Sequence, residues 1–378
     1  MRSIFSPKIV KKVNRGQISS LLLTLNSYLL ITFAAMSFTS ILLQWFSEHG
    51  RALPWRETRH PYAIWLSEII LQQTRIEQGR PYWERFMRRW PTVEALAAAA
   101  EDDVLKEWQG LGYYSRARNL LFAARQVVAL GGFPTTLEGI RQLKGVGDYT
   151  AAAIGSFAFG LPAAVVDGNV FRVLARHFGI ATPINTTEGK KEFTALAQAL
   201  MAPSEAALFN QAMMDFGATQ CTPASPRCAE CPLQETCTAF RENRIAELPV
   251  KRRTLKVKER QLVYIYIRYK GMTALRRRPA GDIWQGLYEP WLAESAPCGA
   301  VLLRQHVKHV LTHRILYADF YLWEPTEKPS LPDGYFWISE ADLDGYAVSR
   351  LIEMLLDALP SPAEAASSAV SDSTKPSD

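Results

Sequence analysis

The chain has 378 residues, and 48% of them are apolar. This length predicts about two domains, and the apolar content is ample for buried cores. Five cysteines in such a length exclude a disulfide-rich secreted domain. The net charge of +6 is weak evidence for DNA binding, because residues 1–36 carry five positive charges and no acid, which leaves about +1 for the rest.

Residues 1–36 join a basic start to an apolar segment at 21–35. A signal peptide and an interfacial anchor both have this outline, and a third interpretation is a misplaced start, with Met36 beginning the real protein. We favour the third interpretation, because a protein with reduced cysteines is expected in the cytosol. The expected location is cytoplasmic, with nucleoid association in a bacterium.

Beyond this extension the hydrophobic pattern changes once. Apolar residues recur at helical spacing over 37–240, which predicts an all-α domain. A basic connector is expected at 241–260, an α+β domain with strands rich in Val, Ile and Tyr at 261–359, and a disordered tail at 360–378. The predicted fold class is multidomain, all-α followed by α+β.

Glu68 lies on an apolar face of a predicted helix. The residues within one turn of it on that face are Ile64, Trp65 and Leu71. Desolvation there would raise the pKa of the Glu68 carboxyl and prepare it to donate a proton. The alternative is an ordinary solvent-exposed helix glutamate.

The segment Gly145-Val146-Gly147 lies between helical patterns at 137–143 and 148–159, as in a helix-hairpin-helix. Glycines let the backbone approach a partner closely, and N–H groups at a helix start can bind phosphate. The alternative is only a tight turn. About twenty residues later, Asp167 precedes another predicted helix, either as an N-cap or as a carboxylate that faces DNA.

Four cysteines lie within seventeen residues: Cys221, Cys228, Cys231 and Cys237. Buried thiols or two disulfides are one interpretation. A zinc site usually needs two CxxC pairs, and this run has one, so an iron–sulfur cluster fits the spacing better. Arg227 lies beside the proposed ligands.

The hairpin, Asp167 and the four cysteines, in this order, resemble the endonuclease III superfamily of base-excision DNA glycosylases over about 42–240. Segments 53–56, 65–74, 110–119 and 209–215 resemble the MutY-type adenine glycosylases within it. Bifunctional members carry a nucleophilic lysine where this chain has Tyr149, so no Schiff base can form at that position.

The MutY-type resemblance implies roles for individual residues. Glu68 would protonate adenine, Asp167 would stabilise the cationic sugar, and Tyr149 and Asn169 would position them. Arg51, Trp55 and Gln211 would line the adenine pocket, while Gln73 and Tyr113 would wedge into the base stack. The hairpin residues Gly145, Val146 and Gly147, and Arg227, would contact DNA, and the four cysteines would hold one [4Fe-4S] cluster.

Residues 261–359 resemble the MutT-like (Nudix-like) C-terminal domain of the same family, with 284–290 as its Gly-Leu-aromatic signature. No run of paired glutamates could hold magnesium, so pyrophosphate hydrolysis is not expected. Leu311, Thr312 and His313 occupy the family's Phe-Ser-His loop, which reads 8-oxoguanine.

The resemblance implies removal of adenine opposite 8-oxoguanine or guanine in double-stranded DNA, by a monomer, with the strand left intact. The alternatives are a bifunctional oxidised-pyrimidine glycosylase with lyase activity, a non-catalytic iron–sulfur protein that binds damaged DNA, and a four-cysteine zinc module.

Overall fold

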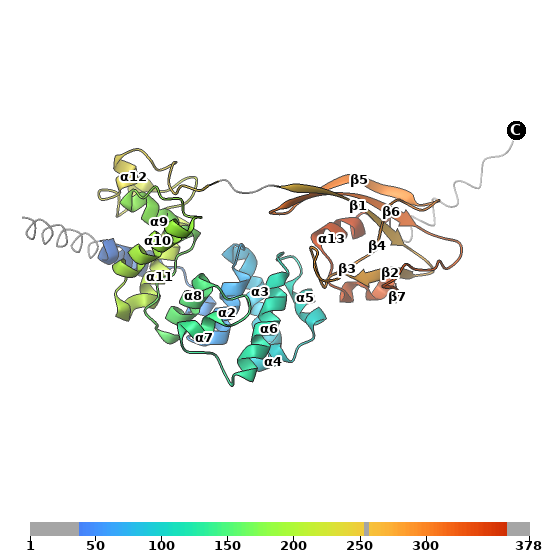
Figure 1. The fold of residues 1–378 in the computed structure, drawn as a ribbon, viewed down its shortest axis with the longest axis horizontal. Helices are drawn as coiled ribbons and strands as arrows, with labels where there is room; N and C mark the ends of the chain where they lie inside the picture. Colours follow the sequence, from blue (N-terminus) through green and yellow to red (C-terminus); the bar gives the residue numbers. More distant parts are fainter. Residues whose placement is uncertain (1–37, 253–256, 361–378) are drawn as a thin grey trace, which may run out of the picture. The chain divides into compact units, whose positions relative to one another are not determined.

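The computed structural model describes residues 38–252 and 257–360 (Figure 1). The expectations for residues 1–36 and for the tail beyond Pro360 lie outside these ranges. The described chain divides into two compact units. Unit 1 holds the described residues up to Glu57 together with Ala151–Arg252, and unit 2 holds Thr58–Thr150 together with the described residues from 257 onward.

Helices fill the first part of the chain, as the hydrophobic pattern predicts. Residues 38–49 are helical. The helices that follow are α2 (Pro61–Ile70), α3 (Ile76–Arg89), α4 (Val93–Ala97), α5 (Glu101–Trp108), α6 (Ser115–Ala129), α7 (Leu137–Arg141), α8 (Asp148–Phe159), α9 (Gly168–Phe178), α10 (Thr187–Leu200), α11 (Ala206–Asp215) and α12 (Thr238–Arg241). A π-helical turn, η3 (Phe216–Gln220), continues α11.

Three helices begin at threonine residues that act as N-caps. The side chains of Thr92, Thr136 and Thr186 each accept a backbone N–H in the first turn of the next helix, which satisfies a donor that has no partner within the helix. Helices α7 and α8 form the expected helix-hairpin-helix, and the turn between them contains Gly145 at φ +80°, a backbone conformation that favours glycine.

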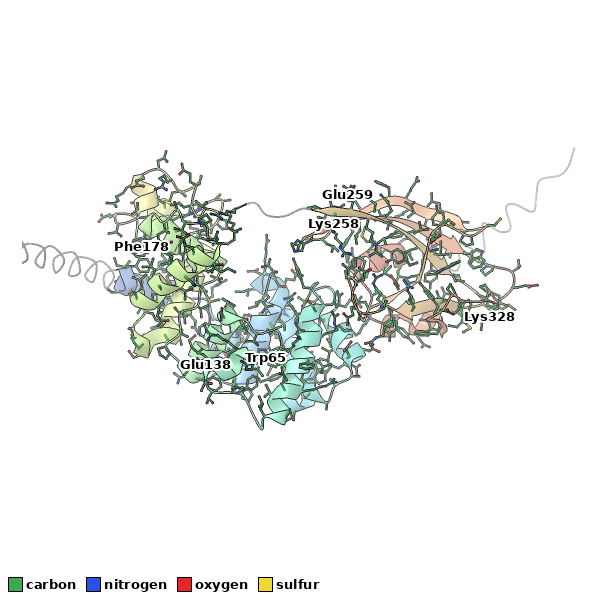
Figure 2. All side chains as sticks on the ribbon, viewed as in Figure 1. Trp65, Glu138, Phe178, Lys258, Glu259 and Lys328 are labelled. Atoms are coloured by element: carbon green, nitrogen blue, oxygen red, sulfur yellow. The ribbon has the colours of Figure 1, made fainter. Side chains whose placement is uncertain are left out.

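Each unit has its own apolar core. In unit 1 the largest fully buried side chains of that core are aromatic: Phe38, Phe193, Phe209 and Phe216. In unit 2 the helix α2 is buried over nearly its whole length, and Trp65 on it is fully buried and packs edge-on against Phe133 (Figure 2). This burial explains why α2 lacks a polar face.

The strands belong to unit 2 and form two sheets. They are β1 (Lys258–Ile267), β2 (Met272–Arg277), β3 (Tyr288–Glu289), β4 (Trp291–Ala293), β5 (Val301–Val310), β6 (Arg314–Trp323) and β7 (Tyr335–Ser339), followed by α13 (Arg350–Leu356). One sheet has the order β4-β1-β6-β5 and the other β3-β2-β7. Strands β1 and β6 are parallel, whereas the other paired strands are antiparallel.

The predicted fold class, helical and then α+β, is confirmed. Strand β1 begins inside the expected connector, with Lys258 and Glu259 as its first residues (Figure 2). The charged side chains there led to the prediction of a connector. The residues form a strand because they pair with β6, which is distant in the chain, in the register Lys258↔Arg314. Within 38–252 and 257–360, no helix combines the length and apolar character needed to cross a membrane.

Candidate active site and nucleic-acid interface

Glu68 lies near the end of α2 and is only 6% exposed. Tyr149, in the first turn of α8, donates a hydrogen bond from Oη to Glu68 Oε2 at 2.9 Å. Gln72, just beyond α2, donates from Nε2 to Thr150 Oγ1 on α8 at 3.3 Å, which adds a second bond between these two parts of the chain. The solvent-exposed alternative for Glu68 is therefore wrong.

Asp167 caps α9, as the N-cap interpretation predicts. Its Oδ1 accepts the backbone N–H groups of Asn169 and Val170, both at 2.8 Å. Its Oδ2 accepts Asn169 Nδ2 at 2.7 Å, and Asn169 Oδ1 in turn accepts Arg172 Nη2 at 2.8 Å. Asn169 therefore orients the Asp167 carboxylate through its Nδ2, and Arg172 orients the Asn169 side-chain amide through its Oδ1.

Burial raises the pKa of Asp167 above its ordinary value, although the hydrogen bonds from Val170 and Asn169 oppose this shift. Arg172 also donates from Nε to Cys221 O at 2.7 Å, so the residue that orients Asn169 touches the cysteine loop. These groups belong to unit 1, whereas Glu68 and Tyr149 belong to unit 2.

Arg51 is not a free pocket residue, because its guanidinium pairs with Asp215 at the end of α11. Arg56 pairs with the same carboxylate, with Nη1 2.8 Å from Oδ2 and Nη2 2.7 Å from Oδ1. Asp215 is fully buried. Burial acts to raise its pKa, but the two guanidinium groups outweigh burial and hold the pKa below its ordinary value. Trp55 is also buried and Gln211 is half-buried.

Gln73 and Tyr113 share an unusual backbone conformation. Both have positive φ angles, 58° and 46°, and both side chains are exposed, Tyr113 by 50%. Non-glycine residues seldom adopt this conformation, and it persists where the surrounding structure imposes it. The adjacent Tyr114 is buried. One tyrosine of the pair therefore belongs to the core and the other faces solvent.

The two glycines of the hairpin turn differ in how closely other atoms approach them. No atom lies within 4 Å of a Cβ built on Gly147, whereas one built on Gly145 would lie 2.8 Å from Asn119 Cβ. Val146 is buried and anchors the turn. The turn therefore packs on α6 through Gly145 and presents Gly147 at the start of α8.

The four cysteines, Cys221, Cys228, Cys231 and Cys237, line one small cavity of about 30 Å³, and Arg227 is exposed beside it. None of these thiols forms a disulfide, which removes that alternative. Burial raises the pKa of Cys231 to about 11.

A four-thiolate centre fits this donor set. The buried Arg176 lines the same cavity and donates from Nη1 to Thr222 O at 2.8 Å and to Cys221 Sγ at 3.5 Å. In the described part of the chain, no three His, Cys, Asp or Glu side chains already stand in a metal-binding arrangement. The cysteines thus share a cavity without forming a closed ligand shell.

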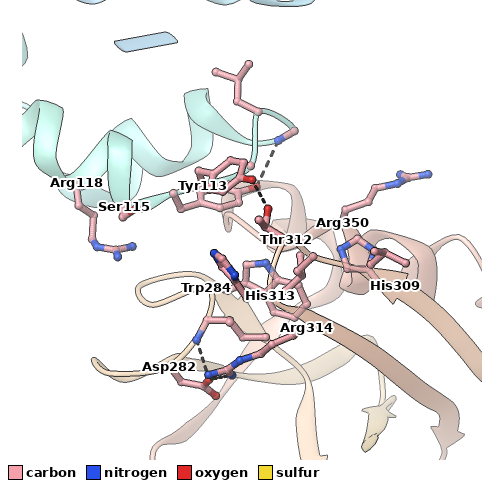
Figure 3. Close-up of a pocket in the computed structure, with 17 residues that line it drawn as sticks. Tyr113, Ser115, Arg118, Asp282, Trp284, His309, Thr312, His313, Arg314 and Arg350 are labelled. Carbon is pink, nitrogen blue, oxygen red and sulfur yellow. Dashed lines mark hydrogen bonds and ion pairs between the residues drawn. The ribbon is translucent and has the colours of Figure 1, made fainter. Parts of the chain in front are cut away.

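Leu311, Thr312 and His313 line a larger pocket of about 610 Å³ in unit 2 (Figure 3). The pocket also contains Tyr113, whose Oη shares a hydrogen bond with Thr312 Oγ1. Leu311 packs partly into the core of the β-rich part, and the other two side chains of this loop are exposed. The loop and the wedge candidate Tyr113 therefore meet in one pocket.

Sequence reasoning missed four charged residues that organise these sites: Asp215, Arg56, Arg116 and Arg172. Three of them, all but Arg172, lie inside segments that carried the family resemblance. A charged residue within an otherwise apolar helical stretch, such as Asp215 at the end of α11, is the signal that could have found them, because such a residue needs a buried partner.

The HhH-GPD superfamily of base excision DNA repair proteins matches residues 66–200, and the NUDIX domain family matches residues 263–358. The adenine DNA glycosylase of Homo sapiens is 45% identical over 214 residues, covering 54% of this chain and 39% of the human protein. The chain therefore spans about two fifths of that relative. The adenine DNA glycosylase of Buchnera aphidicola subsp. Baizongia pistaciae is 32% identical over 298 residues, covering 75% of this chain and 84% of that protein.

Among solved structures, a thermostable thymine-DNA glycosylase is 32% identical with a TM-score of 0.52, covering 55% of this chain and 97% of that chain. A non-covalent endonuclease III–DNA complex is 21% identical with a TM-score of 0.50, covering 56% of this chain and 97% of that chain, and shares the fold. The Nudix match covers the β-rich part and the superfamily match covers the helices around Glu68. The chain belongs to the adenine DNA glycosylase family, within the HhH-GPD superfamily of base excision DNA repair proteins.

Proposed function

We propose that the protein is a monofunctional DNA glycosylase that removes adenine paired with 8-oxoguanine or guanine in duplex DNA. The observation that carries the proposal is the buried Glu68 carboxyl with Tyr149 Oη 2.9 Å away. A buried carboxyl is suited to donate a proton. A phenol in place of the lysine amine orients that carboxyl but cannot form a Schiff base with the sugar.

The reaction breaks the C1′–N9 bond of deoxyadenosine. The bonding electron pair leaves with the base, which takes a proton at N7 from Glu68 and departs as neutral adenine. The sugar becomes cationic, and the Asp167 carboxylate stabilises it while Asn169 keeps Oδ2 in position. Water then adds to C1′, and the proton that it loses restores Glu68. The product is an abasic site in an intact strand.

The DNA must expose its adenine before this chemistry can occur, because the glycosidic bond is inaccessible inside the stack. We propose that Gln73 and Tyr113 wedge into the stack and that Gly145, Val146 and Gly147 bind the backbone, with Arg227 as a further contact. Arg51, Trp55 and Gln211 would line the adenine pocket, with Arg51 held by Asp215. The exposure and backbone conformation of Gln73 and Tyr113 support the wedge role.

Two further parts of the chain are assigned on the same basis. Thr312 and His313 would hydrogen-bond the base opposite adenine, and Leu311 would contribute apolar contact in place of an aromatic ring. Cys221, Cys228, Cys231 and Cys237 would hold one [4Fe-4S] cluster, which would fix the shape of the loop around Arg227. The shared cavity and the free thiols support this assignment.

The test is a single-turnover assay on duplexes containing A:8-oxoguanine, A:G or G:T, each with and without alkali. We expect cleavage of the adenine strand only after alkali. Strand cleavage without alkali would favour a lyase, and release of thymine from G:T would favour the chemistry named for the thymine-DNA glycosylase relative.

Glu68→Gln tests the proton donor. We expect adenine release to fall by about 10²- to 10⁴-fold while the variant still binds the A:8-oxoguanine duplex. The matched control is Glu192→Gln, the same exchange on the exposed face of α10, which should leave both properties unchanged. Appreciable turnover by Glu68→Gln would remove Glu68 from the acid role, and binding without any release by the wild-type chain would indicate a non-catalytic protein.

A further inference from the structure

Arg116, in the first turn of α6, is buried and donates only to backbone carbonyls. It is 8% exposed. Among the described residues, Nη1 donates to the carbonyl oxygens of Ile69 at 2.9 Å, Ile70 at 2.8 Å and Gln72 at 2.6 Å, and Nη2 donates to those of Leu111 and Gly112, both at 3.2 Å. One guanidinium therefore joins two segments about forty residues apart in the chain.

Two of these carbonyls, those of Ile69 and Ile70, belong to the last turn of α2. The last carbonyls of a helix have no partner within it and carry the negative end of the helix dipole. Ile69 and Ile70 directly follow Glu68 in the chain. Arg116 thus satisfies the end of the helix that carries the proposed proton donor.

Two of the five bonds go to the peptides that directly precede the wedge candidates Gln73 and Tyr113. Gln72 O belongs to the peptide that leads into Gln73, and Gly112 O belongs to the peptide that leads into Tyr113. Both wedge candidates have positive φ angles. The guanidinium therefore fixes the orientation of the peptide group that precedes each residue. It helps to hold both residues at positive φ angles, which non-glycine residues seldom adopt.

The Arg116 cation also lies beside the aromatic ring of Tyr113. Its guanidinium carbon lies 5.7 Å from the centre of the Tyr113 ring and 5.0 Å from that of Trp108, which is within cation–π range. Burial lowers the pKa of Arg116 to about 10, so the group remains charged at neutral pH. A planar group with five N–H donors can hold carbonyls on two sides, whereas a lysine ammonium has three donors at a single point.

We propose that Arg116 is a positioning residue that sets the separation and direction of Gln73 and Tyr113, so that both enter the DNA stack together. This inference rests on the proposed function, because it assumes that these two side chains open the duplex. It assigns Arg116 no contact with substrate. Its effect on the rate passes through base opening and not through the chemical step.

The experiment uses the full chain with Arg116→Met, which keeps the approximate length of the side chain and removes every donor, and Arg116→Lys, which keeps the charge. The matched control is Arg125→Met on the same helix. Arg125 donates to Ala97 O at 3.0 Å and to Ala99 O at 3.1 Å, and its side chain is exposed. The control therefore also removes an arginine–carbonyl contact from α6, but away from the wedge.

Single-turnover rates are measured on a duplex with A:G and on one with adenine opposite an abasic-site analogue. An unpaired adenine costs less to extrude. We expect Arg116→Met to lose about tenfold to a hundredfold in rate on A:G and about threefold or less on the unpaired adenine, with Arg116→Lys intermediate. Glu68→Gln should lose equally on both duplexes, because it affects the chemical step.

A double-mutant cycle with Tyr113→Ala adds a second readout. We expect Arg116→Met to cost much less in the Tyr113→Ala background than in the wild type. Equal losses on the two duplexes, or full additivity with Tyr113→Ala, would overturn the proposal and leave Arg116 as a fold-stabilising residue. If Arg116→Met does not fold, the same comparisons with Arg116→Lys decide the question.

Failure of the proposed function gives a different pattern. If the wild-type chain releases no adenine, a 2-aminopurine probe beside the mismatch still reports unstacking when the protein binds. We expect the wild type and Arg125→Met to increase its fluorescence, and Arg116→Met to lose most of that increase at saturating protein. An unchanged increase with Arg116→Met would refute the positioning role whether or not the protein is a glycosylase.

Discussion

Gly217 allows η3 to pack directly against the start of α9, and Gly217→Ala tests whether the position of Asp167 depends on that contact. A Cβ on Gly217 would lie 2.6 Å from Asn169 Cβ, 2.8 Å from its carbonyl oxygen and 2.9 Å from its carbonyl carbon. Ordinary contact begins at 3.4 Å, so Asn169 must move by about 0.8 Å. Two of the three contacts are with backbone, so a change of side-chain rotamer cannot relieve them.

The displacement has two consequences. Overpacking of this kind costs about 1–3 kcal/mol of folding free energy. Asn169 also donates from Nδ2 to Asp167 Oδ2, so the proposed catalytic carboxylate moves with it. Misplacement of a reacting group by about 1 Å can cost about a hundredfold in rate. We therefore expect Gly217→Ala to slow single-turnover adenine release by about tenfold to a hundredfold.

The assay compares single-turnover rates at a temperature where thermal unfolding, followed by circular dichroism, shows the variant to be folded. The matched control is Gly345→Ala, because no atom lies within 4 Å of a Cβ at that position and its φ is not positive. Gly345→Ala should match the wild type in rate and in Tm. A folded Gly217→Ala variant with a rate within about twofold of the wild type would refute the inferred link between η3 and Asp167.

Three further predictions concern the buried charges and the cysteines. Asp215→Ala should lower the free energy of unfolding, measured with urea, by about 3–5 kcal/mol, because two guanidinium groups lose their partner. The pKa of Asp215 is held below its ordinary value of 3.8, so this contribution is present above pH 3.8 and is lost as the pH falls through the lower folded-state pKa; a difference that persists at lower pH contradicts the ion-pair explanation. Asn169→Ala removes a hydrogen bond that lowers the already raised pKa of Asp167, so the pH below which the rate falls should move upward, and an unchanged acid limb would count against a carboxylate role. Cys231→Ser should lower the iron content and Tm of the purified protein, whereas stoichiometric zinc in the wild type would support the zinc alternative.

The parts of the site that depend on local chemistry could be predicted from the sequence. Helical periodicity placed Glu68 on an apolar face, and the structure buries it. The N-cap interpretation of Asp167 followed from its residue type at a helix start, and its side chain does accept the N–H groups two and three residues ahead. The hairpin turn and the grouping of the four cysteines could also be predicted, because a turn and a short cysteine loop involve only residues that are close in the sequence.

Other features required the tertiary structure, because their partners are far apart in the chain. Arg51 and Arg56 meet Asp215 across 164 and 159 residues, and Tyr113 meets Thr312 across 199. No periodicity or spacing specifies such pairs. The start of β1 was missed for the same reason, since its charged first residues are held by pairing with β6.

The sequence alone determined the family and the two fold types, and it predicted the chemistry of single residues, because these follow from short motifs and local periodicity. Only the tertiary structure decided which groups orient them. Arg116 illustrates the difference: in sequence it is one of two arginines in the first turn of a helix, and only folding brings five carbonyls from two segments around it. A buried guanidinium needs hydrogen-bond acceptors. Here the acceptors are backbone carbonyls, which every residue has, so the sequence does not indicate which of them Arg116 will contact.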